Sequence, residues 1–241
     1  MTQDRVSALV TGANSGIGRE VARQLAASGH IVYVGSRNES RGREAVEEIG
    51  GDARLLVLDV TDAGSIARAA GAVEYLDVLV NNAGINLDTL AAPDVDLDAF
   101  RRTYETNVFG GLAVTNAFLP ALRGSARPRI VNVSSGTGSL AWSTGANPQF
   151  PYQTGGSSAA YRSSKTALNA VTLSYAQALE EAGFKVNAIA PGLRATNLTP
   201  GAAARGGDPA EAAAGVVRLA LLPDDGPTGQ FLSWDGSPVP W

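Results

Sequence analysis

The sequence lacks cysteine altogether, and it contains only one histidine and one methionine among 241 residues. Without cysteine, disulfide bonds and thiolate metal ligands are excluded. The one histidine, His30, lies far in sequence from every motif described below, so we expect it on a surface loop and not as a catalytic base. No group of histidine, aspartate and glutamate has the spacing of metal ligands, and we expect no metal site.

Charge and long apolar runs are also scarce. Charged residues make up 17% of the chain and the formal net charge is −4, which argues against nucleic-acid binding as the main activity. No apolar run approaches the length needed to cross a membrane, and the polar residues 1–5 are unlike a signal peptide. We therefore expect a cytoplasmic protein that binds neither nucleic acid nor membrane.

What the chain does contain is a regular alternation of apolar strands and helices. Strands are expected at 6–10, 31–35, 55–58, 78–80, 130–133, 185–190 and 230–233, and helices at 19–28, 40–49, 97–122 and 158–182. Strands separated by such helices form parallel βαβ units. Hydrophobic residues make up 44% of the chain, and it contains neither a linker nor a repeat. The pattern predicts an α/β fold over 1–241: a single domain with a doubly wound (Rossmann) parallel sheet of about seven strands and helices on both faces.

A glycine-rich turn, Thr11-Gly12-Ala13-Asn14-Ser15-Gly16-Ile17-Gly18, joins the first strand to the first helix. Gly12 allows a tight turn, Gly16 lets a phosphate approach the backbone, and Gly18 lets the helix pack closely on the strand. The free N–H groups and the positive end of the helix dipole favour a phosphate here. An ordinary turn with chance glycines is the alternative. The predicted dinucleotide site also includes Asn14, Ser15 and Ile17.

Tyr161 and Lys165 are four residues apart on the predicted helix 158–182, so they share one helical face. A phenol has a pKa of ~10, and a neighbouring ammonium lowers it toward neutrality, which suits acid–base catalysis. Without other evidence, the commoner explanation of such a pair is a buried tyrosine beside a solvated lysine.

Two further polar positions stand out. Ser134 and Ser135 end the fifth strand, where their hydroxyls could bind a carbonyl group or merely terminate the strand. Asn107 is an unfavourable residue inside the predicted helix 97–122, where it could bind water, bind a backbone carbonyl or face solvent.

The spacing T-G-x-x-x-G-x-G, together with Asn82 after the fourth strand and the Tyr161/Lys165 pair, resembles the short-chain dehydrogenase/reductase family. The resemblance runs over nearly the whole chain, because five separated motifs occur in the order found in that family. The tail 219–233 is most similar to the NADPH-dependent carbonyl reductases of the family. The resemblance implies NADPH-dependent reduction of a ketone or aldehyde, a small-molecule substrate, by hydride transfer.

The resemblance also gives roles to four catalytic side chains. It implies that Tyr161 donates a proton to the carbonyl oxygen and that Lys165 lowers the pKa of the tyrosine and holds the nicotinamide ribose. It further implies that Ser135 orients the carbonyl and that Asn107 completes a proton relay through water. Ser135 is preferred to Ser134 because the second serine of such a pair is catalytic in the family.

Other cofactor contacts are implied by the same motifs. They are Asp59 and Val60 at the adenine, Asn82, Ala83 and Gly84 along the ribose, and Pro191, Gly192 and Thr196 around the nicotinamide carboxamide. Arg194 departs from the family pattern, which has an apolar residue there. Its side chain is expected to point away while its backbone makes the contact.

The residue that closes the second strand bears on the choice of cofactor. An acidic residue there accepts hydrogen bonds from the ribose of NAD and repels the additional phosphate of NADP. This chain instead has Ser36, which can donate a hydrogen bond, and Arg37, which can pair with a phosphate. Arg41, one turn further, adds positive charge. We expect NADPH/NADP+, although Ser15 replaces the basic residue of many NADP-using relatives and Arg37 could be a solvated loop charge.

The stretch 136–160, between the serine and the tyrosine, is longer than in most relatives. Its aromatic residues, Trp142, Phe150 and Tyr152, are expected to wall a pocket for bulky or aromatic carbonyls, or to pack on the outer face of the next helix and block a dimer contact. A monomer is slightly favoured over a homo-oligomer.

Two other functions use the same fold. A secondary-alcohol or sugar dehydrogenase would run the same residues toward oxidation, and an NADP-sensing regulator would bind the cofactor without turnover. The presence of all four catalytic residues weighs against the regulator. The physiological substrate stays open, because variable loops build that pocket.

Overall fold

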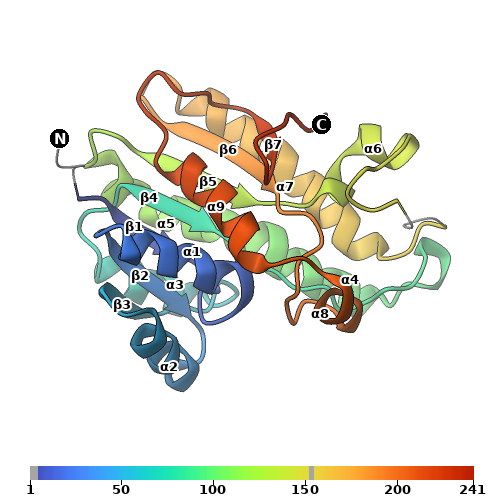
Figure 1. The fold of residues 1–241 in the computed structure, drawn as a ribbon, viewed down its shortest axis with the longest axis horizontal. Helices are drawn as coiled ribbons and strands as arrows, with labels where there is room; N and C mark the ends of the chain where they lie inside the picture. The colour runs from blue at the N-terminus through green and yellow to red at the C-terminus, as the bar shows by residue number, and fades with distance from the viewer. Residues whose placement is uncertain (1–4, 152–154) are drawn as a thin grey trace.

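A seven-stranded parallel sheet runs through the centre of the protein (Figure 1). The computed structural model describes residues 5–151 and 155–241. The strands follow the spatial order β3-β2-β1-β4-β5-β6-β7, so the chain reverses its direction of growth between β1 and β4. Their bounds are β1 Ser7–Val10, β2 Ile31–Ser36, β3 Asp52–Val57, β4 Val78–Asn81, β5 Arg129–Val133, β6 Lys185–Ala190 and β7 Phe231–Ser233. The doubly wound sheet predicted from the alternating pattern is confirmed.

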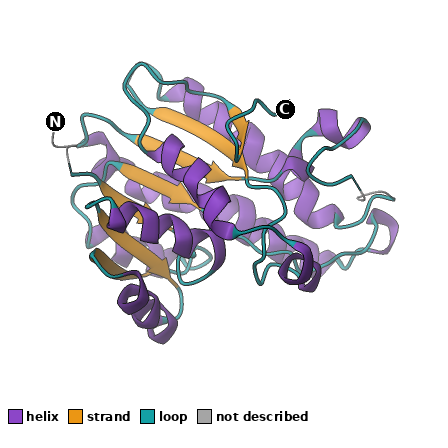
Figure 2. Ribbon diagram, viewed as in Figure 1, coloured by secondary structure: helices purple, strands orange, loops and turns teal. Residues whose placement is uncertain are grey.

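Helices cover both faces of the sheet (Figure 2). On one face α1 and α9 lie side by side, and α2 flanks them. On the other face α3, α5 and α7 pack around the buried Phe118. The helices are α1 Gly16–Ala27, α2 Glu39–Ile49, α3 Ala63–Gly71, α4 Leu97–Tyr104, α5 Gly111–Arg123, α6 Leu140–Thr144, α7 Ala159–Ala178, α8 Pro200–Arg205 and α9 Pro209–Ala220. Because both faces are covered, β1 and β4 are buried along their whole lengths.

The predicted helix 97–122 is not a uniform α-helix. A π-helical turn, η2 Glu105–Gly110, separates α4 from α5. Asn107 lies within this wider turn and is buried. A π-turn inserts one residue into the helical repeat and is often found at functional sites. Periodicity alone indicates a helix here but not this local change of pitch.

His30 is buried, contrary to the expectation that it lies on a surface loop. Its Nδ1 accepts a hydrogen bond from the backbone N–H of Val6 at 3.2 Å. Burial lowers the pKa of its imidazole, with a further lowering from the charge of Arg5. The residue therefore ties the start of β2 to the start of β1, on the edge of the sheet away from the predicted catalytic residues.

The described residues offer neither a membrane span nor a metal site. None of their helices has both the length and the apolar character that crossing a membrane requires. No group of three or more histidine, cysteine, aspartate or glutamate side chains in 5–151 and 155–241 could hold a metal ion.

Candidate active site

A cavity of about 630 Å³ opens over the carboxyl ends of the strands. The reversal of strand order between β1 and β4 creates a crevice at this edge, which is where ligands bind in open α/β sheets. The cavity is lined by most of the predicted cofactor residues: Gly12, Asn14, Ser15, Gly16, Ile17, Ser36, Arg37, Asp59, Val60, Asn82, Ala83, Gly84, Tyr161, Lys165, Pro191, Gly192 and Thr196. Gly18 is not among the lining residues and packs against Gly12 and Asn82.

The glycine turn has the shape that a pyrophosphate requires. Gly12 and Gly16 adopt left-handed φ angles of +62° and +55°, which residues with a side chain rarely adopt. A Cβ atom on Gly18 would lie 2.4 Å from Nδ2 of Asn82 and 2.7 Å from the carbonyl oxygen of Gly12. Helix α1 begins at Gly16, and the free N–H groups of its first turn face the edge of the cavity. The residues present therefore fit a dinucleotide.

Asn82 holds this turn in place. Its Nδ2 donates to the carbonyl oxygen of Thr11 at 2.8 Å, and its backbone N–H donates to the Thr11 hydroxyl at 2.9 Å. The hydroxyl of Thr11 also accepts the N–H of Ala83 at 3.0 Å. Asn82 therefore links the end of β4 to the end of β1. Its side-chain amide is already hydrogen-bonded to the protein, whereas the sequence predicts that Asn82 lies along the cofactor ribose.

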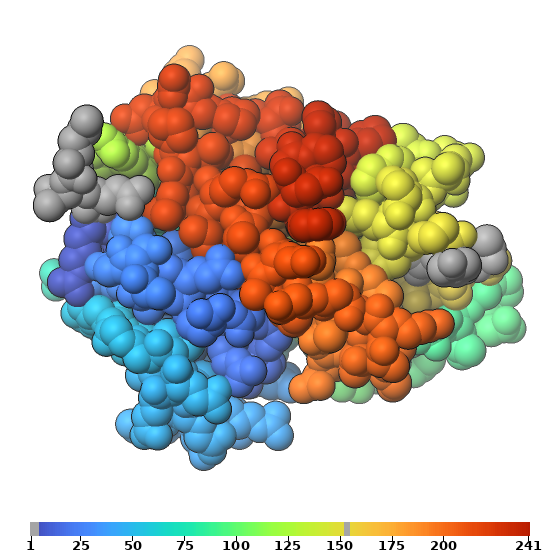
Figure 3. Space-filling view, viewed as in Figure 1, coloured from blue at the N-terminus to red at the C-terminus, as the bar shows by residue number. Residues whose placement is uncertain are grey.

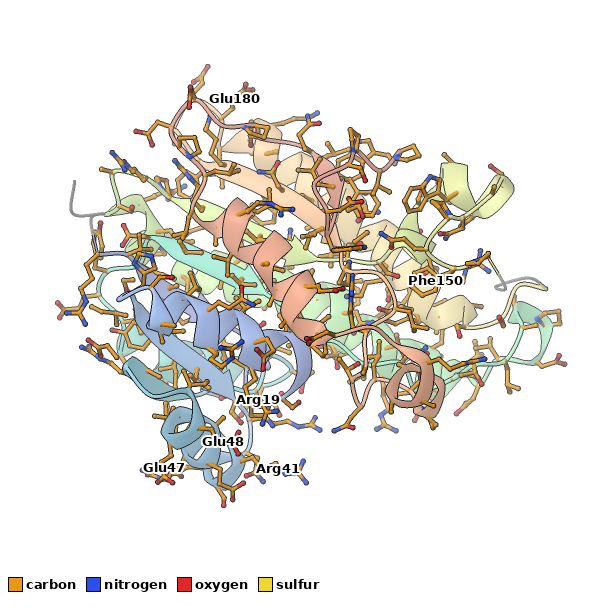
Figure 4. The ribbon with its side chains drawn as sticks, in the orientation of Figure 1. Arg19, Arg41, Glu47, Glu48, Phe150 and Glu180 are labelled. Carbon is orange, nitrogen blue, oxygen red and sulfur yellow. The ribbon has the colours of Figure 1, made fainter. Side chains whose placement is uncertain are left out.

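The end of β2 presents two arginines to the cavity. Arg37 and Arg41 both line it, and neither forms an ion pair with any residue in 5–151 or 155–241. Glu48, on the same face of α2 two turns beyond Arg41, is paired instead with Arg19 at 2.7 Å (Figure 4). Ser36 is buried and donates its hydroxyl proton to the carbonyl of Asn38 at 2.8 Å. To donate the expected hydrogen bond to a phosphate, the Ser36 hydroxyl would have to give up its bond to the Asn38 carbonyl.

Tyr161 and Lys165 lie at the base of the cavity, on the first turns of α7. Nζ of Lys165 is 5.7 Å from the centre of the tyrosine ring and donates to the carbonyl oxygen of Val133 at 2.8 Å. Burial raises the pKa of the Tyr161 phenol to about 12, against a lowering by its hydrogen bond with Ser135. Burial also lowers the pKa of the Lys165 ammonium to about 8. The predicted lowering of the tyrosine pKa by the lysine is wrong for this state of the site, because desolvation dominates.

The two serines at the end of β5 have different surroundings. The hydroxyl of Ser134 donates to Oδ1 of Asn169 at 2.6 Å and is turned toward α7. Oγ of Ser135 lies 2.9 Å from Oγ1 of Thr137 and hydrogen-bonds with Tyr161. Both line the cavity, but only the second faces the phenol. This arrangement agrees with the preference for Ser135.

Asn107 is fixed by three hydrogen bonds. Its Oδ1 accepts the N–H of Ile85 at 2.8 Å, and its Nδ2 donates to the carbonyl of Ile85 at 2.9 Å and to Oγ of Ser164 at 3.0 Å. The π-turn aims the side chain at the loop after β4, so the solvent-facing alternative is excluded. Gly84 packs between Asn107 and Lys165, since a Cβ there would lie 3.4 Å from both Oδ1 and Nζ.

Arg194 does not simply point away, as the sequence led us to expect. Its guanidinium is buried, stacks on the Trp234 ring at 4.3 Å and donates from Nε to the carbonyl of Pro191 at 2.7 Å. It also pairs with Glu211 at the start of α9. The side chain therefore braces the loop 191–196 from behind, while that loop lines the cavity.

The long loop 136–160 contributes less to the cavity than predicted. Phe150 lines the cavity (Figure 4). Trp142 does not: it packs against the apolar cluster of Ala188, Ala190, Phe231 and Val239 at the end of the sheet. The predicted pocket role of Trp142 therefore does not hold, while the blocking of a dimer contact stays a prediction. Tyr152 lies outside the described residues.

One residue of the site was not singled out from the sequence. Thr137 is buried, lines the cavity and contacts Ser135 through both its hydroxyl and its backbone N–H. The signal in the sequence that could have identified Thr137 was its position two residues after Ser135, within a stretch of small residues.

Comparisons with known proteins identify the family. The model of the family described as short chain dehydrogenase matches residues 6–205. The chain is 35% identical to (−)-isopiperitenone reductase of Mentha piperita, over 95% of this chain and 96% of that protein. It is 33% identical to salutaridine reductase of Papaver bracteatum, over 93% of each chain. The alignment with the Mentha protein spans 309 residues, more than the 241 of this chain, so that relative has segments absent here.

A solved structure agrees with these relatives. The NADPH-bound carbonyl reductase from chicken fatty liver superposes with a TM-score of 0.81 at 28% identity, over 98% of this chain and 100% of the other. Members of this family are oxidoreductases that act on carbonyl or alcohol groups with a nicotinamide cofactor. On these matches, which cover most of its length, the chain belongs to the short chain dehydrogenase family.

Proposed function

We propose that this enzyme reduces small-molecule ketones or aldehydes in the cytoplasm, with NADPH as the hydride source and Tyr161 as the proton donor. The observation that carries the proposal is that Tyr161, Ser135 and Lys165 line the same cavity as the glycine turn. The names of the relatives, reductases in each case, agree with it.

The phenol of Tyr161 acts as the general acid. Its pKa is raised by burial to about 12, so it is protonated at neutral pH, as a phenol of ordinary pKa ~10 also is, and it can deliver that proton from the phenol oxygen to the carbonyl oxygen of the substrate. The hydroxyl of Ser135 donates a second hydrogen bond to the same oxygen. The two donors together stabilise the negative charge that develops there.

The ammonium of Lys165 supports the phenolate left after proton transfer. It is anchored on Val133 at 2.8 Å, which fixes its distance from the ring.

Asn107 supports a relay that returns a proton to the site. Both of its amide hydrogens are donated to Ile85 and Ser164, which leaves one lone pair of Oδ1 for a water molecule.

Three groups of residues would hold NADPH. The turn at Gly12, Gly16 and the N-terminus of α1 would bind the pyrophosphate, Asp59 and Val60 would lie at the adenine, and the loop 191–196 would lie at the nicotinamide. When bound, NADPH supplies the hydride that reduces the carbonyl carbon. The closeness of Gly16 to Thr196, whose Cγ2 would lie 3.1 Å from a Cβ on the glycine, keeps the pyrophosphate end narrow.

The preference for NADPH over NADH rests on Arg37 and Arg41. Both line the cavity beside β2 and carry charge that no acidic side chain in the described residues pairs with. An unpaired guanidinium suits a phosphate through two parallel hydrogen bonds. No carboxylate closes β2, because Ser36 occupies that position.

The test is a panel of ketones, aldehydes, quinones and secondary alcohols, each assayed with NADPH, NADH and their oxidised forms. We expect NADPH consumption with carbonyl substrates at a rate well above that of the protein without substrate. Activity confined to alcohols with the oxidised cofactor would favour the dehydrogenase alternative. Binding of NADPH with no turnover on any member of the panel would contradict the proposal.

A further inference from the structure

Thr137 lies in the short helical turn η3 Gly136–Gly138, directly after Ser135. Its side chain is buried, and it lines the same cavity as Tyr161. Oγ1 of Thr137 lies 2.9 Å from Oγ of Ser135, and either hydroxyl can be the donor. The backbone N–H of Thr137 also donates to Oγ of Ser135, at 3.2 Å. Thr137 alone therefore provides two of the hydrogen bonds that the Ser135 hydroxyl can form.

A serine hydroxyl has one hydrogen to donate and two lone pairs that can accept. The N–H of Thr137 occupies one lone pair of Ser135. If Ser135 donates to Thr137, its only hydrogen is used inside the protein and it cannot bind a carbonyl oxygen. If Thr137 donates, the second lone pair of Ser135 is filled, and its hydrogen stays free for a ligand.

The second arrangement is the one that the proposed reduction needs. With both lone pairs filled, Ser135 can no longer accept the proton of Tyr161, which is within hydrogen-bonding reach. The phenol then has the substrate oxygen as its acceptor. A hydroxyl that accepts a hydrogen bond is also polarised toward being a better donor.

We propose that Thr137 is a positioning residue: its hydroxyl donates to Ser135 and thereby commits the Ser135 hydroxyl to donate to the substrate carbonyl oxygen. This inference rests on the proposed function. The neighbouring Ser134 cannot take over the role, because its hydroxyl is bonded to Asn169 at 2.6 Å.

The experiment uses Thr137→Val, which keeps the shape of the side chain and removes the hydroxyl. We expect kcat for a ketone to fall about 3- to 10-fold, the usual effect of one neutral hydrogen bond, while the KM and the binding constant for NADPH stay unchanged. Thr137→Ser restores the hydroxyl and is expected to recover most of the rate. Thr103→Val is the matched control, because Thr103 is buried and, among the described residues, its hydroxyl bonds only to the carbonyl of Ala99, outside the cavity.

A double-mutant cycle with Ser135→Ala decides whether Thr137 acts through the serine. Once Ser135 is removed, Thr137→Val should cause no further loss of kcat. An unchanged kcat in Thr137→Val, or a loss of the same size with and without Ser135, would overturn the inference while leaving carbonyl reduction intact. A wild-type enzyme inactive toward every carbonyl tested would overturn the proposed function, and this inference with it.

Discussion

At the scale of single residues, burial shifts the pKa values of both titratable groups of the site, and the two shifts have opposite directions. It raises the pKa of the Tyr161 phenol to about 12 and lowers the pKa of the Lys165 ammonium to about 8. Each shift favours the neutral form, as expected for groups removed from water. The phenol is protonated at neutral pH, as it would be at its ordinary pKa of ~10, and the lysine still carries its charge.

Replacing Tyr161 with phenylalanine tests the proton donor. The ring that packs near Lys165 is kept and the proton is lost, so kcat should fall by at least about 10²-fold, the lower end of general acid catalysis. The affinity for NADPH, measured by fluorescence, should be unchanged. Tyr175→Phe is the matched control: it lies on the same helix and bonds to Asn116, outside the cavity. A Tyr161→Phe enzyme with a tenth of the wild-type rate would rule out the assignment.

Replacing Arg37 with alanine tests the choice of cofactor. A hydrogen bond to a charged group contributes about 1.5–3 kcal/mol, so the affinity for NADPH should fall by about 10- to 150-fold and that for NADH should not. Arg43→Ala is the control, because Arg43 lies nearby on α2 but pairs with Glu39. Equal wild-type kcat/KM values for NADH and NADPH, or a higher value for NADH, would show that the arginines do not select the phosphate.

At the scale of elements, the π-turn η2 sets where α4 and α5 approach the sheet. A Cβ atom on Gly110 would lie 2.8 Å from the carbonyl oxygen of Val60, whereas one on Gly111 would meet nothing closer than 4.0 Å. Gly110→Ala should therefore lower the free energy of unfolding by about 1–3 kcal/mol through overpacking. Gly111→Ala should be neutral or stabilising by up to about 1 kcal/mol, as in other helices. Chemical denaturation of the two variants measures the difference, and equal stabilities would contradict this close approach.

Elements with a local chemical cause could be predicted from the sequence. The strands follow from apolar runs, and the start of α1 follows from the glycine turn, so their places in the chain are correct to within three residues. The π-turn, the burial of His30 and the stacking of Arg194 on Trp234 were missed. Each of these depends on contacts between segments far apart in the chain, which single-sequence patterns do not encode.

At the scale of the whole molecule, the residues proposed for the phosphate groups of the cofactor and the substrate wall belong to different parts of the sheet. The glycine turn and the arginines lie beside β1 and β2, whereas Phe150 lies in the loop over β5 and β6. That loop is held by residues near position 241: in Figure 3 the dark red C-terminal segment lies against the yellow segment that contains α6. The N–H of Ala141 donates to the carbonyl of Trp241 at 3.2 Å, and Gln149 donates to Ser233 at 3.0 Å.

This division predicts that a change far from the catalytic residues alters substrate binding more than cofactor binding. The Trp241 ring stacks on Phe231 at 5.3 Å, and such aromatic pairs contribute about 0.5–1.5 kcal/mol beyond the area they bury. Trp241→Ala should loosen α6 and the loop that carries Phe150, and raise the KM for a bulky carbonyl by about 2- to 10-fold. The KM for NADPH should change less, because the glycine turn and the arginines lie beside β1 and β2, and only the nicotinamide loop 191–196 follows β6. Trp241→Phe keeps a stacking ring and should stay close to wild type. If both KM values rose together, the two parts of the site would be coupled, and the C-terminal segment would support the whole cavity instead of its substrate wall.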